Sequence, residues 1–94
     1  MILFTAEGLS DVERVRSFLD ARDQAAAKRA LAAIWAALER VERFPALGRP
    51  TEDPDIRQVV IRFGDAGYIV RYSVLTEDQS VLVMRIWQGR EARK

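Results

Sequence analysis

The residues of this chain that could do chemistry are arginines. They make up nearly all of its 15 basic residues. A guanidinium stays protonated and makes planar, bidentate contacts with carboxylates and phosphates, so it binds anions but is a poor proton acceptor. Arg62, Arg71 and Arg85 recur in three strand-like segments, and Trp87 follows the last of them. These four residues predict a binding surface, although solvated arginines are also normal on the wet face of an antiparallel sheet.

Histidine and cysteine are both missing from the 94 residues. Their absence removes the commonest general base and metal ligand, as well as thiolate and disulfide chemistry. An acid–base step would fall to arginine, lysine, tyrosine or a carboxylate. We find no nucleophile–base pair, metal-ligand cluster or phosphate-binding loop, so we predict no catalytic residue, metal or cofactor. The net charge of +1 gives little steering towards nucleic acid, and we expect no direct, specific DNA binding.

Length and composition predict one small domain. A chain with 49% hydrophobic residues can bury a modest core, and no change in composition suggests a boundary, so we assign residues 1–94 to a single domain. No apolar run approaches the roughly 20 residues that span a bilayer, and the N-terminus lacks the features of a signal peptide. We expect a cytoplasmic protein without membrane contact.

The first half of the chain predicts a short strand, over residues 1–5, and a helical hairpin. Ser10-Asp11-Val12-Glu13 has the pattern of a capping box, and predicts a helix from about residue 9 or 10 to residue 20 or 21. Asp23 caps a second helix over about residues 24–43, which Pro45 ends. Helical spacing predicts the buried positions Leu9, Val12, Val15 and Leu19, then Ala27, Leu31, Ile34, Leu38 and Val41. Trp35 lies beside the second stripe, where it either widens the core or lines a groove for a partner helix.

The second half predicts three strands, over residues 57–63, 68–75 and 81–87, which are rich in β-branched and aromatic residues. The resulting order is β-α-α-β-β-β, an α+β fold with a three-stranded antiparallel sheet. Period-two alternation places one set of side chains under the helices: Val59, Ile61, Phe63, Tyr68, Val70, Tyr72, Val74, Leu82, Met84 and Ile86. The opposite, open face collects Val60, Arg62, Ile69, Arg71, Ser73, Val83, Arg85 and Trp87.

Several pieces of sequence recur in the same order as in a known family. They are the apolar first strand, the hairpin ending in Phe44-Pro45-Ala46-Leu47-Gly48-Arg49, the run Gly67-Tyr68-Ile69-Val70-Arg71-Tyr72, and a last strand leading to Gly89-Arg90-Glu91. No single piece is specific, but the ordered combination covers almost the whole chain. It resembles the RelE/ParE family of small bacterial toxins from type II toxin–antitoxin pairs.

The resemblance implies an antitoxin partner. Family members are neutralised by a cognate antitoxin, here expected to be ParD-like, with a DNA-binding N-terminal part and a C-terminal segment that wraps the toxin. A segment that folds on binding would suit an apolar helical hairpin. We expect its contacts at Phe18, Trp35 and Leu38.

The family divides by target. RelE-like members cleave messenger RNA on the ribosome with arginine, lysine and a C-terminal tyrosine, whereas ParE-like members inhibit DNA gyrase. Arg90 matches the C-terminal arginine of the RelE pattern. However, Ile69 replaces the arginine that follows the strand tyrosine, Gln88 stands where many relatives carry histidine, and no tyrosine follows Tyr72.

The resemblance therefore favours a ParE-like, non-enzymatic gyrase inhibitor that contacts its target through Arg62, Arg71, Arg85, Trp87 and Arg90. The alternative is a RelE-like ribosome-dependent endoribonuclease. A third class, an interaction module that kept the fold and lost toxicity, also fits the sequence.

Overall fold

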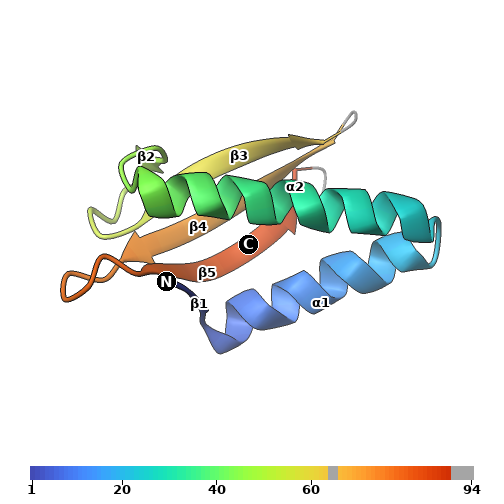
Figure 1. The fold of residues 1–94 in the computed structure, drawn as a ribbon, viewed down its shortest axis with the longest axis horizontal. Coiled ribbons are helices and arrows are strands. Elements are labelled where there is room, and N and C mark those ends of the chain that lie inside the picture. The colour runs from blue at the N-terminus through green and yellow to red at the C-terminus, as the bar shows by residue number, and fades with distance from the viewer. Residues whose placement is uncertain (64–65, 90–94) are drawn as a thin grey trace.

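The computed structural model describes residues 1–63 and 66–89. The element order is β1 (Ile2–Phe4), α1 (Ala6–Asp20), α2 (Gln24–Arg43), β2 (Arg49–Pro50), β3 (Arg57–Phe63), β4 (Ala66–Val74) and β5 (Val81–Gln88). Both helices cover the same face of one five-stranded sheet, so the molecule has two layers (Figure 1). The predicted α+β fold, with an N-terminal strand, a helical hairpin and three antiparallel strands, is confirmed.

The whole sheet is mixed rather than wholly antiparallel. Its strand order is β1-β5-β4-β3-β2, and β1 runs parallel to β5 while the other neighbours are antiparallel. β2 lies outside the predicted strands, and it pairs only with Arg57 and Gln58. Across residues 1–63 and 66–89, no helix is both long and apolar enough to cross a membrane.

Helix α1 starts earlier than the capping-box pattern predicts. Thr5 is the N-cap, and its hydroxyl accepts a hydrogen bond from the Gly8 N–H at 3.0 Å. The Thr5 N–H also donates to the Val83 carbonyl, which fixes the turn from β1 into the helix. Ser10 is thus inside the helix and the predicted cap is wrong, because strand pairing places an equally good cap five positions earlier.

The buried face of α1 also differs from the predicted one. The helix turns Gly8, Asp11 and Val15 to the sheet, whereas Leu9 is 55% exposed, contrary to its predicted burial. A Cβ on Gly8 would lie 2.5 Å from the Val83 carbonyl oxygen, so a glycine is needed for this close approach. Val12 and Leu19 pack against the core as partly buried residues, as expected.

Helix α2 follows its predicted bounds closely. The Asp23 carboxylate accepts hydrogen bonds from the N–H groups of Ala25 and Ala26, which satisfies two of the donors left open at a helix start. Its buried side is Ala27, Ala30, Ile34, Ala37, Leu38 and Val41. Leu31 is only partly buried. The small alanines let α2 lie close to the sheet, so that a modest core is still well packed.

A β-bulge in β5 corrects the predicted faces of this strand. Arg71 pairs with Arg85, but the next residue, Tyr72, pairs with Val83, so Met84 is the extra residue. The period-two pattern therefore breaks at Met84. Val81 and Val83 are fully buried in the core, while Leu82 and Met84, which were predicted there, are only partly buried. Beyond the bulge the pattern resumes, and Ile86 is buried as predicted.

Tyr72 fastens the segment that follows α2 to the sheet. Its hydroxyl donates to the Pro45 carbonyl and accepts from the Gly48 N–H, both at 2.8 Å. A Cβ on Gly48 would lie 2.6 Å from this hydroxyl, and the Gly48 carbonyl accepts a hydrogen bond from Arg57. The Phe44–Arg49 run is therefore more than a helix stop, because its glycine makes room for a buried tyrosine hydroxyl.

Candidate functional site: the open face of the sheet

The face of the sheet opposite the helices is organised as two rows of cross-strand neighbours. One row is apolar, because Val60 pairs with Ile69 and Ile69 pairs with Trp87. The next row is basic and polar: Arg49 pairs with Gln58, Gln58 with Arg71, and Arg71 with Arg85. The face thus offers an apolar strip beside guanidinium groups, the composition typical of a protein-binding surface.

Arg71 is the centre of the basic row. Its Nε donates to the Gln58 side-chain oxygen at 3.0 Å, and its guanidinium lies 5.3 Å from the Trp87 ring centroid. Stacking and hydrogen bonding together orient the group and leave its terminal nitrogens available for an anion. A shallow hollow of about 310 Å³ lies beside it, lined by Arg49, Pro50, Thr51, Glu52, Gln58 and Arg71.

Arg85 is held from the side by helix α1. Its Nε donates to Asp11 Oδ2 at 2.8 Å and its Nη2 to Asp11 Oδ1 at 3.3 Å. Burial alone would raise the pKa of Asp11, but hydrogen bonds from Arg85, the Ile86 N–H and Arg14 hold it below the usual value of an aspartate. The same contact with Asp11 raises the pKa of Arg85.

The structure brings most of the predicted target residues together. Arg62, Arg71, Arg85 and Trp87 lie on the open face, with Arg62 opposite Gly67 at the far end of the β3–β4 pair. Val83, predicted on this face, is instead in the core because of the bulge. Arg90 lies outside the described residues.

The three residues expected to touch an antitoxin do not form one surface. Leu38 is only 1% exposed and belongs to the core, so its placement on a contact surface is wrong; helical spacing alone cannot separate a core leucine from a docking leucine. Phe18 and Trp35 are each 47% exposed. Phe18 lines an apolar pocket of about 220 Å³ between α1 and the sheet, together with Arg14, Val15, Tyr68 and Gln88. Trp35 lies on α2 instead.

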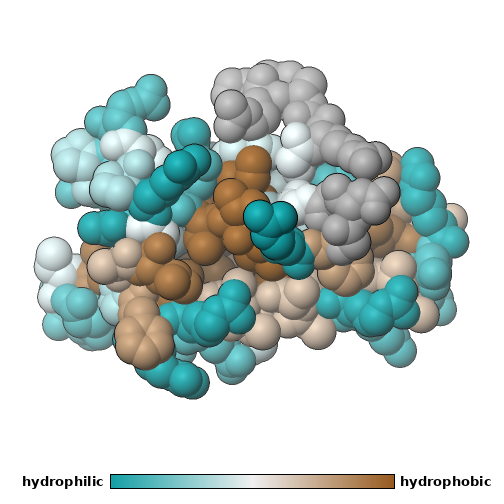
Figure 2. Space-filling model, turned by 90° about the horizontal axis from the view of Figure 1, so that it is seen from above, coloured by the Kyte–Doolittle hydropathy of each residue, from teal (hydrophilic) through white to brown (hydrophobic). Residues whose placement is uncertain are grey.

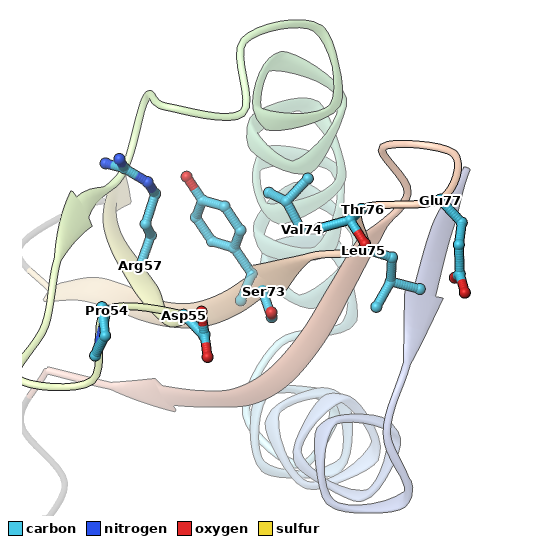
Figure 3. Close-up of a pocket in the computed structure, with 9 residues that line it drawn as sticks. Pro54, Asp55, Arg57, Ser73, Val74, Leu75, Thr76 and Glu77 are labelled. Atoms are coloured by element: carbon cyan, nitrogen blue, oxygen red, sulfur yellow. The ribbon is translucent and has the colours of Figure 1, made fainter.

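A larger hollow, of about 460 Å³, lies at the other end of the sheet (Figure 3). It is lined by Pro54, Asp55, Arg57, Tyr72, Ser73, Val74, Leu75, Thr76 and Glu77. Figure 3 shows the Arg57 side chain pointing away from the carboxylates of Asp55 and Glu77, in keeping with its hydrogen bond to the Gly48 carbonyl. Arg57 and Tyr72 are thus committed to the fold, and we place the functional site on the open face.

Asp11, Gln58 and Arg49 belong to the site although they were not predicted there. Asp11 carried a usable signal, because an acidic residue at the spacing of the buried stripe of a helix needs a partner. Gln58 alternates with Val60 and Arg62 and could have been assigned to the open face in the same way. Arg49 gave no signal, since its place depends on the short β2 pairing.

This fold, a helical hairpin over one face of a mixed sheet, matches solved structures of toxin–antitoxin systems. The chromosomal ParDE system from P. aeruginosa gives a TM-score of 0.59 at 19% identity, covering 90% of both chains. The intact E. coli RelBE toxin–antitoxin complex gives 0.60 at 20% identity, covering 99% of this chain and 98% of the other. These matches establish the fold.

Sequence comparison then gives the family. Residues 2–93 match the family described as the ParE toxin of the type II toxin–antitoxin system parDE, and the chain belongs to it. Toxin RelE1 of Caulobacter vibrioides is 36% identical over 92 residues, covering 98% of this chain and 96% of the relative. The putative toxin Y4kP of Sinorhizobium fredii is 28% identical over 87 residues, covering 93% and 88%. The predicted RelE/ParE membership is confirmed.

Proposed function

We propose that this toxin inhibits DNA gyrase by binding it through the open face of the sheet, without cutting a nucleic acid. The observation that carries this proposal is the kind of group on that face. Among the described residues, the basic and polar row of that face consists of arginine and glutamine side chains. Beside it lies the apolar row, which ends in Trp87. Such a surface suits an acidic partner, and neither an arginine nor a glutamine side chain is a useful proton acceptor.

The two tyrosines support the same reading. A tyrosine is the group that a RelE-like cleavage reaction would use beside arginine. Here Tyr68 is 2% exposed and Tyr72 is fully buried, and both lie on the core side of the sheet. The Tyr72 hydroxyl is engaged with Pro45 and Gly48, and burial raises its pKa above the usual value of a tyrosine. Neither hydroxyl is placed to activate a ribose hydroxyl on the open face.

A ribosome-dependent endoribonuclease is the second candidate, and one specific observation favours it. The relative with 36% identity is named Toxin RelE1. The arginine row could stabilise the charge of a phosphate in a transition state even without a good base. Cleavage would then depend on arginines alone or on a group supplied by the ribosome.

Two assays with purified components separate the candidates. Gyrase supercoiling of relaxed plasmid and cleavage of a translated messenger on ribosomes are each measured with and without toxin. Blocked supercoiling with intact messenger supports the gyrase proposal. Cut messenger with unaffected gyrase overturns it in favour of the ribonuclease, and no effect in either assay points to the interaction module that has lost toxicity.

A cognate antitoxin is the second partner that we propose, and a ParD-like protein is the expected kind. The pocket beside Phe18 accepts an apolar side chain, and Trp35 offers a second anchor on α2. An antitoxin segment that reaches both must run across the helical hairpin. A neighbouring reading frame that encodes a small protein with a ribbon-helix-helix-like DNA-binding part would support a working pair.

We predict that Phe18→Ala and Trp35→Ala each weaken antitoxin binding about tenfold or more, because aromatic anchors dominate such interfaces. The dissociation constant is measured by titration calorimetry against the cognate antitoxin. Leu47→Ala is the matched control, because Leu47 is similarly exposed, at 48%, but lies in the segment after α2. Unchanged affinity in both aromatic variants, with the fold intact, would show that the antitoxin does not bind through these residues of the helical hairpin.

A further inference from the structure

Helix α1 completes the edge of the sheet where strand β1 stops. β1 pairs with β5 only from Val81 to Val83. Directly beyond it, the Thr5 hydroxyl donates to the Met84 carbonyl at 3.1 Å. The edge of β5 is therefore covered first by a strand and then by the start of a helix, so side chains of α1 take over the hydrogen bonding of a neighbouring strand.

The next backbone groups of this edge are covered by Asp11 and Arg14. The Ile86 N–H donates to Asp11 Oδ2 at 2.8 Å, and Arg14 Nη2 donates to the Ile86 carbonyl at 2.9 Å. Asp11 is only 5% exposed. The hydrogen bond to the backbone of the strand edge is enough to explain why a carboxylate is buried here. It does not explain why the same carboxylate also contacts Arg85.

The bulge and Asp11 together fix the Arg85 side chain. The extra residue Met84 offsets Arg85 from the regular alternation, directly before the Ile86 N–H that Asp11 binds. Nε and Nη2 of Arg85 grip both oxygens of the carboxylate. A guanidinium has five N–H donors, so this bidentate contact uses two and leaves three for another partner. The Arg85 side chain remains 53% exposed, and its strand neighbour is Arg71.

We propose that Asp11 is a positioning residue of the target-binding face, which holds the Arg85 guanidinium in one orientation beside Arg71 to receive a carboxylate of the target protein. The proposal rests on the proposed function. Two like charges on directly paired residues of one face repel each other, and Asp11 offsets this repulsion. A guanidinium that is already immobilised also loses little freedom when the partner binds.

The test compares four proteins: wild type, Asp11→Asn, Arg85→Ala and the double variant. Asparagine keeps the volume of aspartate and an oxygen that can accept the Ile86 N–H, but removes the charge that grips Arg85. Glu13→Gln is the matched control, because it removes an acidic charge from the same helix at an exposed position whose partner is Arg16. Thermal unfolding of every variant shows that it is folded.

The first readout is independent of any target. Hydrogen exchange of the Arg85 Nε–H, followed by NMR, is expected to be slow in wild type and Glu13→Gln and about tenfold faster in Asp11→Asn, because the acceptor that protects it is weakened. The second readout is the toxin concentration that blocks gyrase. It should rise about tenfold in Asp11→Asn and in Arg85→Ala, and the double variant should be no worse than Arg85→Ala, since coupled residues are not additive.

Each contrary outcome overturns a different part. Unchanged exchange of the Arg85 Nε–H in Asp11→Asn would show that the Asp11 carboxylate does not hold the Arg85 guanidinium. Faster exchange with full gyrase inhibition in Asp11→Asn shows that Arg85 needs no positioning, and an additive double variant shows that Asp11 does not act through Arg85. If wild-type toxin leaves gyrase active and cuts messenger, both the proposed function and the proposed carboxylate partner are wrong. The exchange of the Arg85 Nε–H still reports whether Asp11 holds Arg85.

Discussion

Tyr72 shows how much one side chain can contribute to joining distant parts of this toxin. Its hydroxyl lies among backbone groups of the segment that follows α2, although the residue belongs to β4. Sequence alternation placed Tyr72 in the core correctly. The two hydrogen bonds could not be predicted, because they depend on where a segment 24 residues away returns to the sheet. The sequence resemblance marked the same residues without giving this physical reason.

Tyr72→Phe should lower the free energy of unfolding by about 1–3 kcal/mol, because the buried Gly48 N–H loses its acceptor. Urea unfolding followed by circular dichroism measures the change. Val74→Ala in the same strand is a useful comparison, since it removes partly buried apolar surface without breaking a hydrogen bond. A phenylalanine variant as stable as wild type would show that water replaces the tyrosine hydroxyl.

Asp11 should also make stability depend on pH at the acid end. Its pKa is lower in the folded protein than in the unfolded chain, so the unfolded chain takes up the proton first as the pH falls. The stabilisation is therefore complete above the unfolded value of about 3.9 and is lost as the pH drops through the folded pKa. The unfolding free energy of Asp11→Asn should fall less steeply below about pH 4 than that of wild type. Parallel curves for the two proteins would contradict this.

Among the elements, the helices and strands were predictable but their starts and faces were only partly so. Period-two alternation identified the open face through Arg62, Arg71 and Trp87. It failed at the beginning of β5, because a bulge is a property of two paired strands and leaves no mark on one strand alone. It could not reveal the edge contact of Asp11 either, since that contact depends on how α1 lies against β5.

The start of α1 gives a direct test of which residue caps the helix. Thr5→Ala should cost about 1 kcal/mol, because the Gly8 N–H loses its acceptor, whereas Ser10→Ala inside the helix should be neutral or slightly stabilising. Chemical unfolding of both variants, measured side by side, decides between them. A larger loss at Ser10 than at Thr5 would restore the predicted capping box.

At the scale of the whole molecule, the two proposed partner sites lie on opposite sides of the sheet. The helical hairpin covers one face of the sheet (Figure 1), and the cross-strand pairing places the arginine row on the other. Seen from above, hydrophobic atoms gather in the middle of the side formed by β3 and α2, with hydrophilic atoms around them (Figure 2). An antitoxin that holds the hairpin therefore needs to reach around an edge before it can cover the target face.

This separation predicts that target binding and antitoxin binding can be lost independently. Arg71→Ala should raise the toxin concentration that blocks gyrase about tenfold or more, since it removes the central guanidinium and its stack on Trp87. Its affinity for the antitoxin should stay within about twofold of wild type. Parallel loss of both activities would mean that the antitoxin contacts the arginine row directly.

The covered edge of β5 has a consequence for self-association. β1 and the side chains of α1 cover the edge of β5, so this side of the sheet ends in a strand of only three residues, whereas β2 pairs with only two residues of β3 on the other side. Strand-by-strand growth into a fibre needs a free edge at both ends of every copy. A strand of three residues is a poor template for another strand, so a second copy would extend this sheet more readily through β3. The edge contacts of α1 thus disfavour growth of this sheet from both of its sides.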